Sequence, residues 1–112
     1  MGAISDIVIH CIAQEDITGT DDLDFYIDSN YVGRVTIGTG QTVHAVGPGL
    51  LLGDTIWCDV GNTINVYEYD LLDPSDLLLS HTVASSDMDT TVTLANTGGN
   101  CTYSFEFTFV AI

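Results

Sequence analysis

The sequence contains no lysine, and its only strongly basic residue is Arg34. Sixteen acidic residues oppose that one base, so the formal net charge is −15 at pH 7. Proteins that bind nucleic acids need basic side chains to replace the counterions of the phosphates, and this balance argues against a nucleic-acid partner. The same charge should repel an anionic membrane unless a divalent cation bridges the two.

Long apolar runs are also missing, and no window shows the apolar spacing that is typical of a helix. No segment approaches the ~20 consecutive apolar residues of a membrane-spanning helix. The first six residues contain no base and no continuous apolar run, which is not the pattern of a secretory leader. The length of 112 residues predicts a single domain, residues 1–112, with a core that needs no disulfide or structural metal.

Cysteine is scarce and odd in number, with Cys11, Cys58 and Cys101 as the three copies. A secreted disulfide framework more often has an even number, and no spacing here is typical of a zinc site. We interpret the cysteines as buried thiols that act as small apolar residues. One disulfide and one remaining thiol is the alternative.

Short runs that alternate between apolar and polar residues recur along the chain, separated by Gly, Asn and Asp. The clearest is the last, in which Tyr103, Phe105, Phe107 and Phe109 alternate with polar residues. Such runs predict strands at residues 7–14, 23–28, 31–37, 41–46, 55–60, 63–69, 77–83, 89–94 and 102–109. Strands with one apolar face are buried by packing two sheets together. The sequence therefore predicts an all-β fold, an antiparallel two-sheet β-sandwich of about eight strands.

Most of the acids are aspartates, and many of them gather in two segments, residues 15–24 and residues 68–76. A surface that is acidic only for solubility would use glutamate as readily, but glutamate occurs at only three positions. Aspartate is short, favours turns and fits tight oxygen cages. In the second segment, the period of two places Glu68 and Asp70 in line with the core residues of their strand. Carboxylates that converge at a strand end repel one another unless a cation is present, and Ca²⁺ accepts about six to eight oxygens in flexible geometry.

The two segments resemble the calcium-binding loops of C2 domains. The acid-x-Asp-x5-Asp spacing of Glu68, Asp70 and Asp76 is similar to the third calcium loop of that family. The pattern Asp16-x-x-Gly19-x-x-Asp22, followed by an aromatic strand, resembles the first. The resemblance implies a C2-like sandwich in which both loops lie at one tip and share calcium.

The ligands that the resemblance implies are Asp16, Asp22, Glu68, Asp70 and Asp76, with Glu68 at a position where the family usually has aspartate. Asp24 and Asp73 are possible additional ligands. The likeness covers about 25 residues. It departs from the family at Leu23, where proline is usual, and at Leu79, where glycine is usual; a lysine-rich strand is absent. The other loop aspartates are interpreted as turn residues, namely Asp21, Asp28, Asp54, Asp59, Asp87 and Asp89.

The function predicted from these features is that of a calcium-binding, non-catalytic β-sandwich module. No Gly-x-Ser-x-Gly elbow is present, and the three histidines fall on separate predicted strands, so no catalytic set is indicated. Two alternatives remain open. The apolar segments 49–53 and 77–79 could be covered in a homo-oligomer, as in a self-assembling protein of a filament, shell or matrix. A calcium-dependent lectin, in which the ion also holds sugar hydroxyls, is the other.

Overall fold

The computed structural model describes residues 1–14, 19–70 and 75–112. Almost all of its regular structure is strand. The strands are β1 (Gly2–Ala13), β2 (Asp21–Ile27), β3 (Asn30–Ile37), β4 (Thr42–His44), β5 (Ile56–Trp57), β6 (Thr63–Glu68), β7 (Asp76–Thr82), β8 (Thr91–Ala95) and β9 (Thr102–Ala111), with one short 3-10 turn, η1 (Ser85–Asp87).

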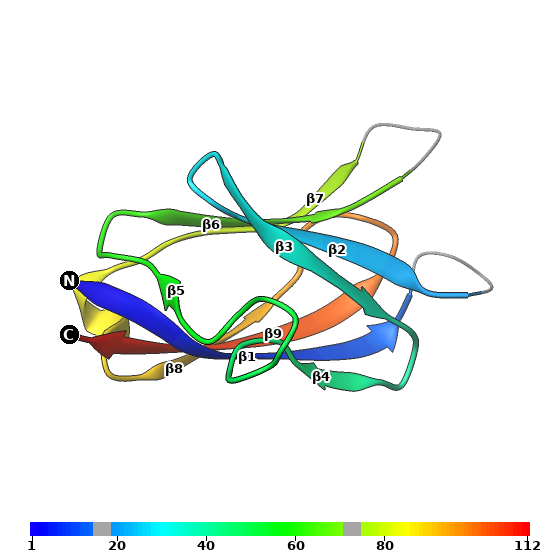
Figure 1. Cartoon of the computed structure of the whole chain (residues 1–112). Coiled ribbons are helices and arrows are strands. Elements are labelled where there is room, and N and C mark those ends of the chain that lie inside the picture. Colours follow the sequence, from blue (N-terminus) through cyan, green and yellow to red (C-terminus); the bar gives the residue numbers. More distant parts are fainter. Residues whose placement is uncertain (15–18, 71–74) are drawn as a thin grey trace.

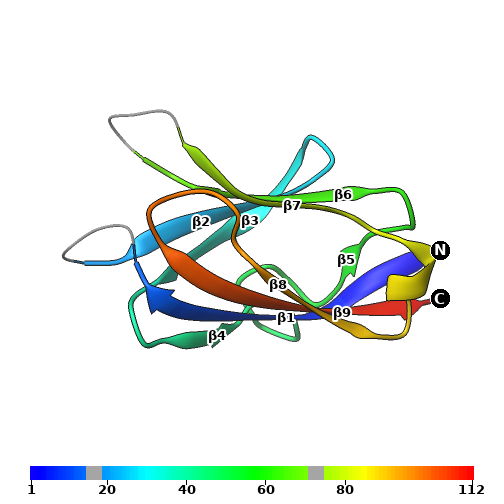
Figure 2. The same cartoon turned by 180° about the vertical axis from the view of Figure 1, so that it is seen from behind.

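The strands form two antiparallel sheets that face each other, which confirms the predicted all-β sandwich (Figure 1). One sheet has the order β4-β1-β9-β8, with β5 also paired to β1, and the other has the order β3-β2-β6-β7. The reverse view shows the same two layers from behind (Figure 2). Both termini lie at one end of the sandwich, and the end of β1, the start of β2, the end of β6 and the start of β7 lie at the other (Figures 1 and 2).

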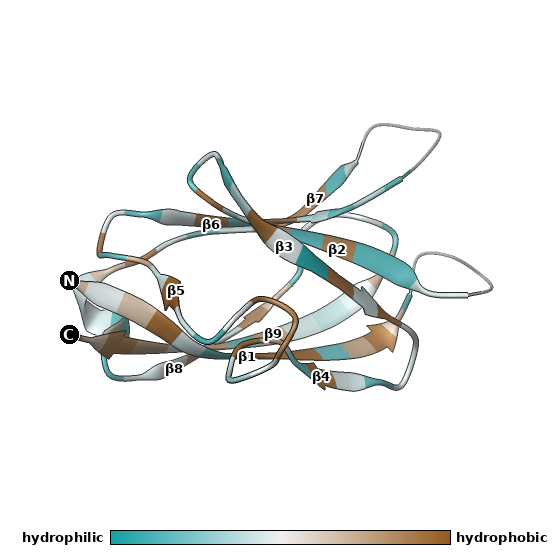
Figure 3. Ribbon diagram, viewed as in Figure 1, coloured by the Kyte–Doolittle hydropathy of each residue, from teal (hydrophilic) through white to brown (hydrophobic). Residues whose placement is uncertain are grey.

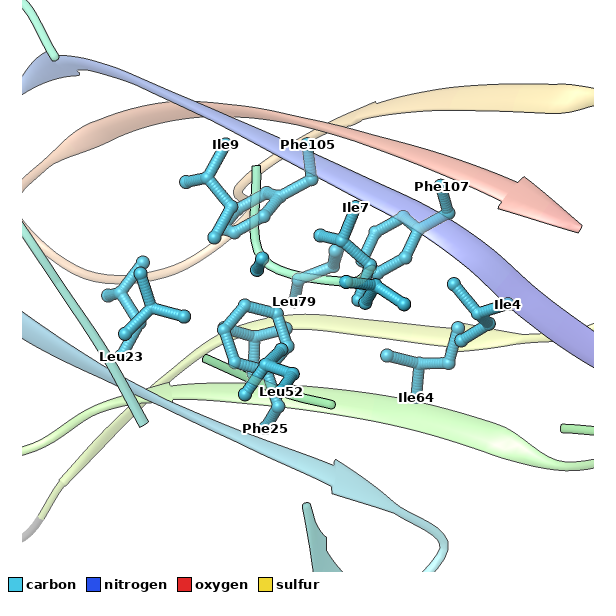
Figure 4. Close-up of a cluster of buried hydrophobic side chains, with 14 of the residues drawn as sticks. Ile4, Ile7, Ile9, Leu23, Phe25, Leu52, Ile64, Leu79, Phe105 and Phe107 are labelled. Carbon is cyan, nitrogen blue, oxygen red and sulfur yellow. The ribbon is translucent and has the colours of Figure 1, made fainter. Parts of the chain in front are cut away.

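The core lies between the two sheets and is built from the inward side of each strand. In β9 the alternation gives four almost fully buried rings, Tyr103, Phe105, Phe107 and Phe109. Successive ring centroids are 5.8, 6.2 and 6.2 Å apart. Figure 4 shows two of these rings meeting Phe25 and the aliphatic side chains of the opposite sheet. Each buried ring contributes roughly 2–3 kcal/mol by its transfer from water, so β9 anchors the sandwich.

The strands β4 and β5 are shorter than predicted, and two of the register shifts between strands interrupt the simple alternation of apolar and polar residues. The strand β1 begins at Gly2, five residues earlier than predicted, because a register shift between Ile4 and Asp6 keeps both Ile4 and Ile7 buried despite their odd spacing. A second shift lies opposite Val66 and Tyr67. It buries both Leu78 and Leu79 and leaves Leu77 exposed. Two of the three leucines at residues 77–79 are therefore buried within the molecule itself.

Hydrophilic residues are concentrated near one end of the second sheet. Figure 3 shows hydrophilic colour at the starts of β2 and β7, at the end opposite the termini. Within the described part of the chain, no helix has the length and apolar character needed to cross a membrane.

Candidate acidic site at the end of the sandwich

The described flanks of the two acidic segments meet at one end of the β3-β2-β6-β7 sheet. Leu23 in β2 is the Cα partner of Glu68 in β6, and Glu68 is the Cα partner of Asp76 in β7. The pairing continues one residue past β6, because the Tyr69 N–H donates to the Asp22 carbonyl at 2.8 Å. The chain therefore brings the start of β2, the end of β6 and the start of β7 side by side.

Cross-strand register decides which acids face the interior. Residues that oppose each other in an antiparallel pair point to the same face. Leu23 is fully buried, so its partner Glu68 faces the core and is only 3% exposed. Asp76, the partner of Glu68, starts β7 on that same face and is partly buried. Asp70 follows Glu68 by two positions and is also partly buried.

Asp21 is a buried acid that sequence analysis assigned to a turn. It begins β2 and is fully buried, on the same side of the strand as Leu23. The hydroxyl of Tyr103, in the opposite sheet, donates a hydrogen bond to Asp21 Oδ2 at 2.5 Å. Burial, with the hydrogen bond to Asp21 adding to it, raises the pKa of Tyr103 far above its ordinary value, so this hydroxyl stays protonated. The sequence signal that could have placed Asp21 in the core is its spacing of two positions from Leu23, because residues two apart in a strand face the same side.

Asp22 and Asp24 lie on the outer face of the same sheet. Asp22 Oδ1 accepts a hydrogen bond from Thr36 Oγ1 at 2.7 Å, and Asp22 Oδ2 is 4.0 Å from Arg34 Nη1. Asp24 makes a two-pronged pair with Arg34, with Nε to Oδ1 at 2.8 Å and Nη2 to Oδ2 at 3.0 Å. Tyr31 adds a hydroxyl at 3.3 Å from Asp24 Oδ1. The hydrogen bond to Asp24 raises the pKa of Arg34 further above its usual range.

The predicted ligand set is thus divided between two faces. The structure brings Glu68 and Asp76 together on the inner face and places the Asp22 carboxylate on the outer face. Asp16 and Asp73 lie outside the described residues. Among the residues that are described, no group of three or more His, Cys, Asp or Glu side chains is arranged to hold a metal ion.

Each histidine contacts one acid that is not among the predicted metal ligands. The pairs are His10 with Glu106 at 2.6 Å, His44 with Asp6 at 3.6 Å and His81 with Asp87 at 2.8 Å. All three cysteines have free thiols, but Cys101 is only partly buried, whereas the sequence predicted that all three are buried. Cys11 and Cys58 are buried, and burial raises the pKa of the Cys58 thiol to about 11.

Comparisons with known proteins add no family assignment: no protein-family model matches the chain, and no curated protein matches it.

Proposed function

We propose that the chain is a calcium-binding, non-catalytic β-sandwich module whose ion lies at the inner end of β2, β6 and β7. The observation that carries the proposal is the gathering of acids on one face there. Asp21 and Glu68 are almost completely buried, and Asp76 lies directly opposite Glu68 on the neighbouring strand. Buried carboxylates are costly without compensation by positive charge or hydrogen bonds.

The choice of calcium follows from the chemistry of the donors. Carboxylate oxygens on flexible strand ends suit Ca²⁺, whereas Mg²⁺ requires a stricter octahedron and keeps more of its water. Asp70, two positions beyond Glu68 and partly buried, is the candidate for a further oxygen ligand. The likeness of residues 68–76 to a C2 calcium loop supports the same ion, and Asp16 remains a ligand predicted from the sequence.

Calorimetric titration with Ca²⁺, together with melting curves in calcium and in chelator, tests the proposal. Binding to the folded state stabilises it by ~2.7 kcal/mol at a hundredfold excess over Kd. Since a domain of this size unfolds with an entropy of roughly 0.24 kcal/mol/K, the melting temperature should rise by about 11 °C. Absence of both heat and a melting shift at millimolar calcium would reject the proposal.

Substitutions identify which acids hold the ion. Asp76→Asn and Asp21→Asn remove inner carboxylates and should weaken calcium binding by about tenfold or more, because affinity depends on the charge of the ligand set. Asp54→Asn is the matched control, since it removes the same charge from an exposed loop residue. Asp22→Asn should behave like this control, because its carboxylate faces outward. Equal losses for Asp22 and Asp76 would favour a site that spans both faces.

The assembly alternative is read from the same titration by sedimentation velocity. It is favoured by the exposure of Leu51 and Trp57, which are 63% and 60% exposed. Growth of the sedimenting species with calcium would show that calcium binding leads to self-assembly. A monomer at every calcium concentration would reject self-assembly and leave calcium binding as the proposed function.

A further inference from the structure

The outer face of the β3-β2-β6-β7 sheet carries four of the five tyrosines, Tyr26, Tyr31, Tyr67 and Tyr69. Tyr26 is the cross-strand partner of Tyr31, and Tyr67 is the partner of the outward-facing Asp24. The Tyr26 ring meets Tyr31 edge to face with centroids 5.3 Å apart. This face is therefore aromatic and acidic at once, and it lies on the side of the sheet away from the inner acids.

One cation already binds on this face and shows the chemistry. The guanidinium carbon of Arg34 lies 4.2 Å from the centroid of the Tyr69 ring, which is a cation–π contact. Its N–H groups are held at the same time by the Asp24 carboxylate. A ring face combined with an acid on a neighbouring strand thus forms a guanidinium site within this chain.

A second combination of rings and acid on the same face forms a pocket. The rings of Tyr26 and Tyr67 are 5.5 Å apart and nearly perpendicular, at 84°, so they form two walls of a corner. They line an open pocket of about 430 Å³ with Asp28, Ser29 and Ser75. The Asp28 carboxylate is fixed by the Thr63 N–H at 3.0 Å and the Asn62 amide at 2.9 Å.

The chain has no basic side chain left for this pocket. Arg34 is engaged at Asp24, and the sequence contains no lysine and no second arginine. Two aromatic walls with an acid form the arrangement that recognises cationic groups. The net charge of −15 attracts basic partners over a longer range and disfavours acidic ones.

We propose that the pocket of Tyr26, Tyr67 and Asp28 binds an arginine side chain from a basic segment of a partner protein. Arginine is favoured over lysine because its flat guanidinium stacks on a ring while it donates hydrogen bonds to a carboxylate. The serine hydroxyls of the pocket accept further N–H bonds. This binding is separate from the proposed calcium site, which would lie on the inner face.

Fluorescence anisotropy with a labelled hexa-arginine peptide tests the proposal, at about 0.15 M salt to limit non-specific attraction. Chelator is present throughout, so the result does not depend on calcium. Hexa-citrulline, the neutral isostere, and hexa-lysine are the comparison peptides. We expect binding in the order arginine, lysine, citrulline, with citrulline undetectable.

Three variants that leave the net charge unchanged separate the pocket from general electrostatics. Tyr67→Leu removes the aromatic wall and should weaken hexa-arginine binding about three- to tenfold. Tyr67→Phe keeps the ring and should stay within about twofold. Trp57→Leu removes an exposed aromatic from the other sheet and should also stay within about twofold. A melting curve of each variant checks that it is folded, and Tyr26→Leu replaces Tyr67→Leu if that variant does not fold.

The carboxylate is tested separately with Asp28→Asn. Asp28 has a positive φ of 54°, and asparagine tolerates that backbone conformation. Its matched control is Asp54→Asn. Asp28→Asn should weaken hexa-arginine binding several-fold, and Asp54→Asn should not. Three results would each overturn the proposal: no binding of hexa-arginine, equal binding of citrulline, or equal affinities for the Tyr67→Leu variant and the wild type. Equal binding of citrulline would assign the pocket to neutral hydrogen-bonding ligands such as saccharides.

Discussion

Replacing Tyr103 by phenylalanine removes one buried contact between the two sheets and leaves the packing of the ring intact. The lost group is the hydroxyl that donates to Asp21 Oδ2, from β9 to β2, at the acidic end of the sandwich. Both side chains are at most 1% exposed, so water cannot replace the donor without entering the core. The stacking of the ring on Phe105 is unchanged in the variant.

The size of the effect follows from the charge of the acceptor. A hydrogen bond to a charged group contributes roughly 1.5–3 kcal/mol, and Asp21 keeps its other contacts in the variant. We therefore expect the free energy of unfolding in chelator to fall by about 2 kcal/mol. At an unfolding entropy of roughly 0.24 kcal/mol/K, this loss lowers the melting temperature by about 8 °C.

Urea denaturation followed by circular dichroism measures the difference, with the slope m as a check that the unfolding transition itself is unchanged. The same measurement at saturating calcium adds a second result. In chelator, the positive end of the Tyr103 hydroxyl dipole stabilises the Asp21 carboxylate. A calcium ion held by Asp21 would stabilise the same carboxylate, so Tyr103→Phe should lower the free energy of unfolding by less in calcium. A loss below about 0.5 kcal/mol in chelator would refute the reasoning about the hydrogen bond. Equal losses in both conditions would place the ion away from Asp21.

Three further predictions concern the outer face, the pH dependence and the thiols. Arg34→Met leaves the nearly buried Asp24 without its arginine and should cost about 2 kcal/mol in a urea titration, between the values for exposed and buried pairs. The Ala84 N–H and then His81 hold the pKa of Asp87 below its usual 3.8, so its stabilising contribution is complete above that pH and is lost as the pH falls further. The acid unfolding curve of Asp87→Asn should accordingly be less steep below pH 3.8. Because burial raises the pKa of Cys58 to about 11, iodoacetamide at pH 8 should modify Cys101 well before Cys58, as followed by mass spectrometry.

The fold could be predicted because alternation is a local property. In β9 and β2, apolar residues occur at every second position of a continuous segment. The apolar face that results must be covered by a second sheet. The first half of β1 was missed because a bulge near Ser5 changes the parity between Ile4 and Ile7. Such a shift leaves no local mark, since it depends on how β1 pairs with β9.

The candidate site was harder to predict because it depends on register between strands. Neighbouring residues of one strand point to opposite faces, so Asp21 and Asp22 could not both face the core. Parity with Leu23 was enough to select Asp21. That Glu68 lies opposite Leu23, and Asp76 opposite Glu68, is a property of the paired sheet that no single segment contains.

The division of charge between the two faces of this sheet bears directly on function. The outer acids Asp22 and Asp24 share the only arginine of the chain. The inner acids Asp21 and Glu68 lie on the other face, and the sequence holds no lysine or second arginine that could be placed beside them. A cation that binds beside these inner acids would therefore come from solution, and the proposed calcium ion is such a cation. Because a bound ion makes the free energy of unfolding depend on calcium at constant pH, a pair of unfolding titrations in calcium and in chelator tests whether these acids hold one.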